Sequence, residues 1–244
     1  MSMGQKIELS IDAGDAEVAG VLTLPHGSNA VVVFVHGTQS SRASPRNVFL
    51  SEELNRHGIG TLLFDLATVE EHDAPEEADP SKFEGMRSVH RLTHALDWLA
   101  LAPRTARMRF GLFGAGSGAG ISLLSAAERP LLVHAVVSRG GELDLAGDAL
   151  PRVLAPTLFI VGSHDAPALG WNQSAGSRMK APHELQVISG ASHLFTEPGK
   201  LEEVSELAVS WFSTYLRPEQ PVEPPPPDPR RPSYERNRPD PRYS

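Results

Sequence analysis

The stretch MRFGLFGAGSGAGISLL, residues 108–124, joins an apolar strand to a helix through a turn made only of small residues. Its first part, Met108–Phe113, is predicted to be a strand, and Gly114–Gly120 supplies the turn and the first helical residues. A sharp turn from strand to helix needs minimal side chains, because the helix starts almost directly at the end of the strand. The free N–H groups at the start of such a helix favour a negative charge. The turn at residues 114–120 is therefore a candidate anion-stabilising site.

Apolar runs and helical patterns alternate on both sides of this turn. Two N-terminal segments with period-two alternation, separated by a turn at Gly14 and Asp15, predict a pair of antiparallel strands. The predicted strands are Lys6–Ile11, Glu17–Leu24, Ala30–His36, Ile59–Leu66, Met108–Phe113, Leu131–Ser138, Thr157–Val161 and Leu185–Ile188, and the main predicted helices are Ser44–Arg56, Phe83–Leu101 and Leu201–Leu216. This alternation predicts an α/β fold: a mostly parallel, doubly wound sheet with helices on both faces and an antiparallel N-terminal edge.

The composition excludes several classes of function. With 22 basic and 30 acidic side chains the formal net charge is −8, which disfavours binding to the phosphate backbone of a nucleic acid. The absence of cysteine excludes disulfides, thiolate zinc sites and thiol catalysis. The first 15 residues lack the apolar segment of a secretory signal, and the longest apolar run, Ala30–Val35, is too short to span a bilayer. We therefore expect a cytoplasmic protein without membrane insertion.

The composition changes sharply after Leu216. Residues 217–244 hold 10 of the 21 prolines, including Pro224–Pro227, together with six arginines and five acidic residues. We expect one domain over residues 1–216 and an extended, disordered proline-rich tail over residues 217–244, because such a segment cannot bury apolar surface. The alternative interpretation is a docking strip for a protein partner, with Tyr234 and Tyr243 as its anchors.

The polar residues with catalytic potential follow the ends of predicted strands. His36-Gly37-Thr38-Gln39-Ser40 follows one strand, Gly162-Ser163-His164-Asp165 another, and Ser189-Gly190-Ala191-Ser192-His193 a third. In a parallel sheet these ends meet at one edge, where ligands bind. We expect the Asp165 carboxylate to lie within about 3.2 Å of a nitrogen of His193, the reach of a hydrogen bond. There the acid orients the imidazole, which acts as a general base.

Four stretches of the chain together resemble the dienelactone hydrolase branch of the α/β-hydrolases. They are HGTQSSRASPRN (36–47), GLFGAGSGAG (111–120), VVSRGGELDLAGDALPRVLAPTLFIVGSHD (136–165) and GASHLFTEPGKLEEV (190–204). The resemblance covers residues 6–216 and implies an α/β-hydrolase fold. It also implies hydrolysis of a small carboxylic ester or lactone by a Ser–Asp–His triad, without metal or cofactor. Asp165 is then the acid and His193 the base, and the backbone at Thr38 and Ser117 forms the oxyanion hole.

The chain departs from this family at the nucleophile. When the motif G-x-S-x-G is placed on Gly114 and Gly118, the nucleophile's position falls on Gly116, and Ser117 follows one residue later. Three explanations are open: Ser117 is the nucleophile of a shifted turn, the protein is a catalytically silent pseudoenzyme, or the serine has been replaced by engineering. We expect weak or absent esterase activity in the chain as it stands, and recovery when serine is placed at position 116.

Two motifs suggest a cofactor or a metal instead. Gly114-x-Gly116-x-x-Ala119 satisfies a dinucleotide fingerprint, and Arg139 at the end of the next strand is placed to face the 2′-phosphate of NADP. This interpretation leaves the late Asp and His unexplained, so we expect no cofactor. His90 and His94 have the spacing of a two-histidine zinc face, but no third ligand is evident and we expect no metal.

The remaining candidates concern the substrate. Arg42, Arg46 and Arg139 follow strand ends, where they either clamp a substrate carboxylate or form surface ion pairs. Trp171 either covers the pocket or simply lies near the start of a helix. The acidic segment Glu70–Asp79 is either a lid or a solvated loop.

Overall fold

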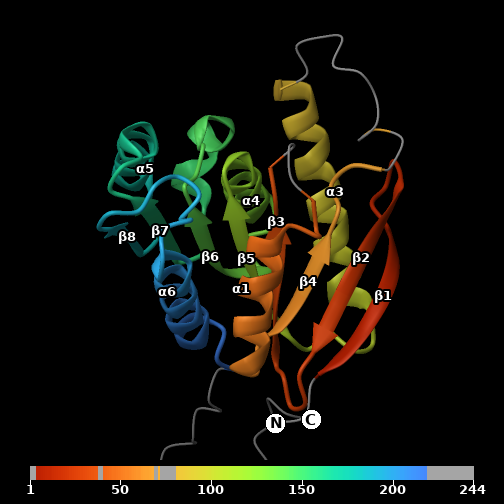
Figure 1. The fold of residues 1–244 in the computed structure, drawn as a ribbon. Coiled ribbons are helices and arrows are strands. Elements are labelled where there is room, and N and C mark those ends of the chain that lie inside the picture. The colour runs from red at the N-terminus through yellow and green to blue at the C-terminus, as the bar shows by residue number, and fades with distance from the viewer. Residues whose placement is uncertain (1–3, 38–40, 69–70, 72–80, 219–244) are drawn as a thin grey trace, which may run out of the picture.

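The computed structural model describes residues 4–37, 41–68, 71 and 81–218. The strands are β1 (Gln5–Asp12), β2 (Glu17–Leu24), β3 (Ala30–Val35), β4 (Gly60–Phe64), β5 (Arg109–Ala115), β6 (Val133–Arg139), β7 (Thr157–Gly162) and β8 (His183–Ile188). The helices are α1 (Pro45–Arg56), α3 (Ser81–Leu101), α4 (Ser117–Glu128), α5 (Ala166–Arg178), α6 (Lys200–Tyr215) and the 3-10 helix η1 (Asp144–Arg152). Together they form a sheet with helices on both faces (Figure 1).

The sheet has the order β1-β2-β4-β3-β5-β6-β7-β8. From β4 to β8 neighbouring strands run parallel, whereas β2 pairs with both β1 and β4 in the antiparallel direction. The predicted parallel sheet with an antiparallel N-terminal edge is confirmed. As expected for this arrangement, the carboxyl ends of the parallel strands lie at one edge of the sheet.

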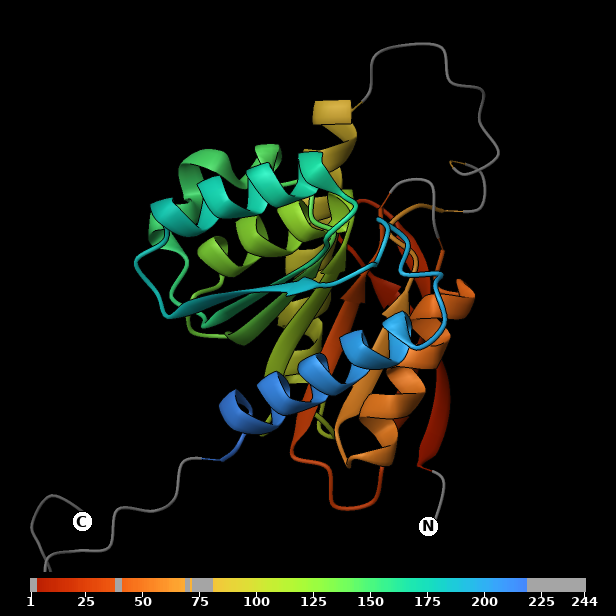
Figure 2. The ribbon, with the colours of Figure 1, turned by 60° about the vertical axis from the view of Figure 1, so that its left-hand side comes forward.

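The two faces of the sheet bury separate apolar clusters. In β3, Val31, Val33 and Val35 pack into one cluster, while Val32 and Phe34 pack into the other. The first cluster takes side chains from α3, α4 and α5, and the second from α1 and α6. Figure 2 shows α6 and α1 on the opposite side of the sheet from α4 and α5. This double cover explains why β3 is apolar throughout, since a strand buried on both faces has no solvent side.

The turn from β5 into α4 packs closely against the neighbouring strand. A Cβ placed on Gly118 would collide with the carbonyl oxygen of Val35 in β3, so only glycine fits there. β5 continues to Ala115, two residues beyond the predicted end, because Gly114 and Ala115 still pair with β6. The small residues of this stretch thus allow the N-terminus of α4 to pack directly against the carboxyl edge of the sheet.

Two features of the local structure differ from prediction. Ser44 occupies the N-cap position of α1 as predicted, but its side chain makes no capping hydrogen bond. The 3-10 helix η1 was not predicted. Its buried residues Ala146 and Ala149 follow the buried Leu143 at three-residue spacing, the period of a 3-10 helix, which is the signal that could have revealed it.

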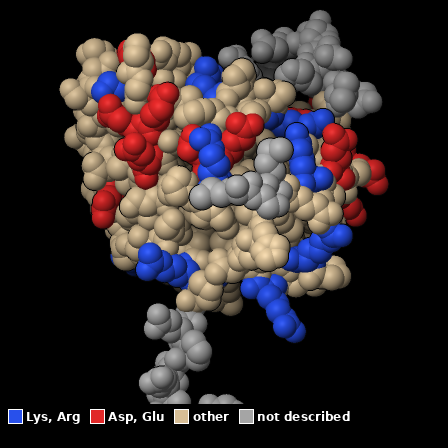
Figure 3. Space-filling view, turned by 60° about the horizontal axis from the view of Figure 1, so that its bottom comes forward, with Lys and Arg blue, Asp and Glu red and all other residues tan. Residues whose placement is uncertain are grey.

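The surface carries charges of both signs. On the face in Figure 3, acidic side chains lie in the upper half, several of them beside basic ones, and basic side chains lie along the lower edge. No helix among the described residues is long and apolar enough to cross a membrane. The predicted tail lies outside the described residues beyond Pro218, as does most of the acidic segment Glu70–Asp79, of which Glu71 alone is described.

Candidate active site

Asp165 and His193 meet at the carboxyl edge of the sheet. Asp165 Oδ2 lies 2.7 Å from His193 Nδ1, which confirms the predicted contact. Asp165 is 8% exposed and also caps α5, where its Oδ1 accepts a hydrogen bond from the backbone N–H of Ala168 at 3.3 Å. The imidazole is held through Nδ1, so its other nitrogen, Nε2, remains available for proton transfer.

Backbone hydrogen bonds join the two loops that carry this pair. The N–H of Ser163 donates to the carbonyl of Ile188, and the N–H of His164 donates to the carbonyl of Ala191, both at 3.0 Å. The N–H of Gly190 donates to Ser163 Oγ at 2.8 Å. The loops after β7 and β8 are therefore joined by hydrogen bonds, which fix Asp165 and His193 relative to one another.

Gly116 lies at the apex of the turn between β5 and α4. Its backbone has φ 57° and ψ −127°, a conformation that residues with a side chain rarely adopt. Its N–H donates to the carbonyl of Arg139 at 3.2 Å, which fixes the turn against β6. Apart from its chain neighbours, a Cβ built on Gly116 meets no atom of the described residues within 4 Å, and Gly116 lines the adjacent cavity. A side chain at position 116 would therefore project into open space from a strained strand-to-helix turn.

Ser117 faces the other side of the turn from His193. A Cβ built on Gly37, after β3, would lie 2.7 Å from Ser117 Oγ, whereas one built on Gly140, after β6, would lie 3.3 Å from the His193 ring. In the sheet, β3 and β6 flank β5 on opposite sides. Within the part of the chain that the structure describes, no hydrogen bond joins Ser117 to His193. The hydroxyl of Ser117 is thus directed toward the His36–Gly37 loop and away from the base.

A cavity of about 1120 Å³ opens above this edge of the sheet. His36, Gly37, Gly116, Ser117, Arg139 and His193 are among its lining residues, and η1 forms one wall. Sequence reasoning did not identify that wall. Thr38, assigned to the oxyanion hole from the resemblance, lies outside the described residues.

Arg139 lies in this cavity as a buried cation. Arg139 is only 7% exposed, and its Nε and Nη1 atoms have no hydrogen-bond partner among the described residues. Burial, aided by the positive charge of Arg46, lowers the pKa of Arg139 to about 10. Arg46 lines the same cavity, and its Nε is also buried without a partner in the described part. Both arginines proposed from their positions after strand ends therefore reach the cavity.

Arg42 is not among the cavity's lining residues, and it forms an ion pair, the second of the two alternatives that its position allowed. Its backbone N–H donates to Asp65 Oδ1 at 2.9 Å, and its guanidinium pairs with Oδ2 of the same carboxylate. Burial alone would raise the pKa of Asp65, but the His36 imidazole, 3.6 Å away, and the hydrogen bond from the Arg42 backbone outweigh it and hold this pKa below its ordinary value. The charge of Arg42 is thus already neutralised within the protein.

Trp171 does not line the cavity either. It lies on α5 with 42% of its surface exposed. The buried side of α5 carries Ala168, Asn172, Ala175 and Gly176, a stripe at helical spacing that Trp171 does not share.

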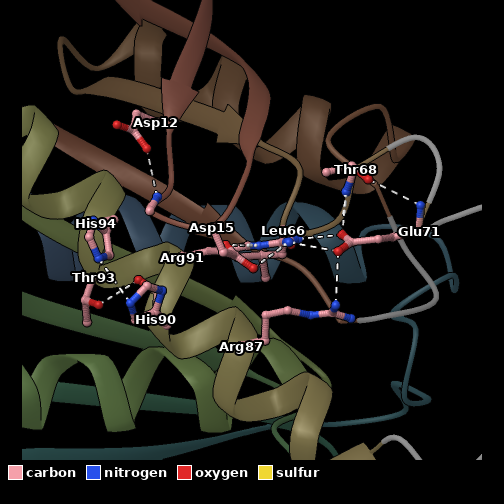
Figure 4. Close-up of polar contacts among 11 residues, drawn as sticks. Asp12, Asp15, Leu66, Thr68, Glu71, Arg87, His90, Arg91, Thr93 and His94 are labelled. Carbon is pink, nitrogen blue, oxygen red and sulfur yellow. Dashed lines mark hydrogen bonds and ion pairs between the residues drawn. The ribbon is translucent and has the colours of Figure 1, made fainter.

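A buried arginine anchors the N-terminal hairpin and the segment after β4 to α3. Arg91 is 1% exposed; its guanidinium contacts Asp15 at 2.8 and 2.9 Å and Glu71 at 2.6 and 2.9 Å (Figure 4). These hydrogen bonds from Arg91 hold the pKa of Glu71 at about 2. Glu71, predicted to belong to a lid or a solvated loop, is therefore a structural anion.

His90 and His94 lie one turn apart on the same helix. Their Nε2 atoms are 3.2 Å apart, so the two imidazoles share one face of the helix. Among the described residues, no group of three histidine, aspartate or glutamate side chains is arranged to hold a metal ion.

Residues 19–216 match the Dienelactone hydrolase family. A protein of Mycobacterium tuberculosis, provisionally named a phosphoribosyl transferase, is 46% identical over 209 residues, which make up 86% of this chain and 46% of that protein. This chain thus spans about half the length of the curated relatives it matches.

Solved structures agree with this match. The crystal structure of a dienelactone hydrolase from Anabaena variabilis is 44% identical, with a TM-score of 0.85 over 88% of this chain and 100% of that one. A serine hydrolase homologue from Coxiella burnetii, 19% identical, shares the α/β-hydrolase fold with a TM-score of 0.68 over 86% of this chain and 98% of that one. Together with the sheet order and the match over residues 19–216, these likenesses show that the chain belongs to the dienelactone hydrolase family.

Proposed function

We propose that this chain has an active site of the dienelactone hydrolase type, specific for small carboxylic esters or lactones, in which glycine occupies the position of the nucleophile. The observation that carries the proposal is the backbone of Gly116. It has the strained conformation of a nucleophile turn, and the space around its Cα is open to the cavity. His193 and Asp165 complete the site, and the chain as it stands turns over esters weakly or not at all.

The mechanism follows from these positions when serine is placed at residue 116. His193 Nε2 takes the proton of the introduced hydroxyl as its oxygen attacks the carbonyl carbon, and Asp165 stabilises the imidazolium that forms. The backbone N–H of Ser117, at the start of α4, faces the negative charge that develops on the carbonyl oxygen. The alcohol leaves with the proton from His193, and water then hydrolyses the acyl-enzyme to the acid and the free serine.

The test compares ester hydrolysis by the unaltered chain, G116S, G116A and S117A, with a small activated ester as substrate. We expect G116S to raise the rate by several orders of magnitude, because an aligned nucleophile opens the acyl-enzyme route. G116A is the matched control, since it adds a side chain at the same strained position without a hydroxyl. If the unaltered chain is already fast and S117A abolishes its activity, Ser117 is the nucleophile and the proposal is wrong.

A second candidate function is a catalytically silent hydrolase-fold protein that binds a partner through residues 217–244. The glycine at position 116 favours it, because the family's nucleophile is missing while the rest of the site remains. It predicts that neither G116S nor any other variant in the series hydrolyses an ester or a lactone, and that truncation after Arg217 abolishes partner binding.

A further inference from the structure

The side chain of Arg139 carries a positive charge that no described residue neutralises. The residue is 7% exposed at the carboxyl end of β6, and its Nε and Nη1 are sealed from solvent without a hydrogen-bond partner among the described residues. The described residues offer its side chain one compensating contact, the ring of Phe195, whose centroid lies 6.0 Å from Cζ. A buried charge without a partner destabilises the folded state, so its presence calls for a ligand.

The acidic side chains around the cavity do not supply that partner. Glu142, Asp144 and Asp148 line the cavity, but all three are exposed at its rim. Asp148 pairs with Arg178 at 3.2 Å. No ion pair joins any of the three to Arg139 or Arg46 in the described part of the chain, and no acidic group contributes to the lowered pKa of Arg139. As far as the described residues go, the interior of the cavity is thus positive and its rim is acidic.

A second cation, Arg46, and the N-terminus of α4 both lie near Arg139. Arg46 lines the cavity, has a buried Nε without a described partner, and is close enough for its charge to disfavour the charge of Arg139. The carbonyl of Arg139 accepts the N–H of Gly116, so Arg139 lies directly beside the N-terminus of α4. The helix dipole adds positive potential there.

We propose that Arg139 and Arg46 bind a phosphate monoester group of the cavity's ligand, so that the ester or lactone processed at Gly116 and His193 is a phosphorylated one. The phosphate site stands on the two arginines alone, whereas the phosphorylated substrate also rests on the proposed hydrolase function. A phosphate monoester carries close to two negative charges at neutral pH and therefore neutralises both guanidinium groups, whereas a carboxylate neutralises one. Its three oxygens also accept hydrogen bonds from two arginines at once.

The binding test uses the full chain and inorganic phosphate, titrated by calorimetry at neutral pH and constant ionic strength. We expect saturable binding of one phosphate, and binding of acetate at least about tenfold weaker. Both R139Q and R46Q lower the phosphate affinity by at least about tenfold, the factor for losing a charge-assisted hydrogen bond. The matched control is R129Q, which removes an arginine paired with Asp97 on the surface and leaves the affinity unchanged. Absence of binding, equal affinity for acetate, or unchanged affinity in R139Q overturns the proposal.

Thermal unfolding separates a ligand-binding arginine from a structural one. In phosphate-free buffer, R139Q has a higher melting temperature than the unaltered chain, because it removes an unpaired buried charge. Phosphate raises the melting temperature of the unaltered chain but not that of R139Q. A lower melting temperature for R139Q would show that Arg139 is a structural residue. R46Q changes a half-buried position and therefore provides an independent measure of phosphate affinity.

Hydrolysis by G116S distinguishes this inference from the proposed function. We expect a phosphorylated ester to have a KM at least about tenfold lower than its neutral analogue, and R139Q to remove this difference. If neither ester is hydrolysed but phosphate binds as described, the proposed function fails and the phosphate site stands. If both esters are hydrolysed with equal KM and phosphate does not bind, the phosphate site fails alone.

Discussion

The carboxylate of Asp165 lies 2.7 Å from Nδ1 of His193, although 28 residues separate the two in sequence. The acid is held as the N-cap of α5, and the base lies in a loop that is hydrogen-bonded to the loop after β7. The Asp–His pair is therefore held by a helix cap and by backbone hydrogen bonds, beside a turn whose apex is glycine.

Asp165→Asn, tested in the G116S background, keeps the shape of the acid but removes its charge. The amide favours the wrong tautomer of His193 and cannot stabilise the imidazolium, so kcat should fall by about four orders of magnitude. Steady-state kinetics with an activated ester measures this loss. Glu203→Gln removes an exposed carboxylate on α6 and is the matched control. A fall of less than about tenfold in D165N would show that the hydrogen bond to His193 has no part in the reaction.

Gly116→Ser should reduce stability while it raises activity. A residue with a side chain at φ 57° and ψ −127° is strained, so the free energy of unfolding should fall by about 1–3 kcal/mol. Chemical denaturation measures the change. G116A should lose a similar amount, whereas G170S should lose none, because Gly170 is equally open but has no positive φ. Equal stabilities for G116S and G170S would contradict the strained turn.

Arg91→Met should be among the most destabilising changes in the N-terminal half. It leaves the carboxylates of Asp15 and Glu71 without their shared partner, and breaking such a buried network lowers the free energy of unfolding by about 3–5 kcal/mol. Arg129→Gln breaks a partly exposed pair with Asp97 and should lower it by about 1 kcal/mol or less. Similar losses in the two variants, measured by urea denaturation, would show that the network around Arg91 contributes no more than a surface pair.

Glu71 should make the fold sensitive to acid. Hydrogen bonds from Arg91 lower its pKa from 4.5 to about 2, so the folded state favours the ionised form. The resulting stability, at most about 3 kcal/mol, is fully present above pH 4.5 and is lost as the pH falls toward 2. The free energy of unfolding, measured by chemical denaturation at several pH values in this range, should therefore change less with pH in E71Q than in the unaltered chain. An identical pH dependence in the two proteins would mean that the contact with Arg91 does not lower the pKa of Glu71.

The sheet and the Asp–His pair could be predicted because they depend on local patterns. Strand β2 was predicted with its observed bounds from period-two alternation, and the other strands with bounds that differ by a few residues. Parallel strands with short loops place their carboxyl ends at one edge, so Asp165 and His193 had to lie near one another once their loops were assigned. The position of Gly116 followed from the spacing of the surrounding glycines.

The features that could not be predicted depend on contacts that no local pattern encodes. Arg91 is anchored by Asp15, 76 residues away in sequence, and Arg42 is paired with Asp65, 23 residues away. The location of Trp171 depends on which side of α5 faces the sheet. The stripe of small residues on that helix is only a weak indication of its buried side. The roles of such side chains depend on partners that are distant in sequence and come close only in the folded chain.

The most direct test of the central claim, that position 116 is the nucleophile's place, is to map the adduct of a fluorophosphonate by mass spectrometry. These reagents form a covalent bond with a serine that an adjacent base activates. We predict an adduct on the serine introduced in G116S, none in the unaltered chain or in G116A, and loss of the G116S adduct when His193 is changed to alanine. An adduct on Ser117 of the unaltered chain that disappears in S117A would contradict the account.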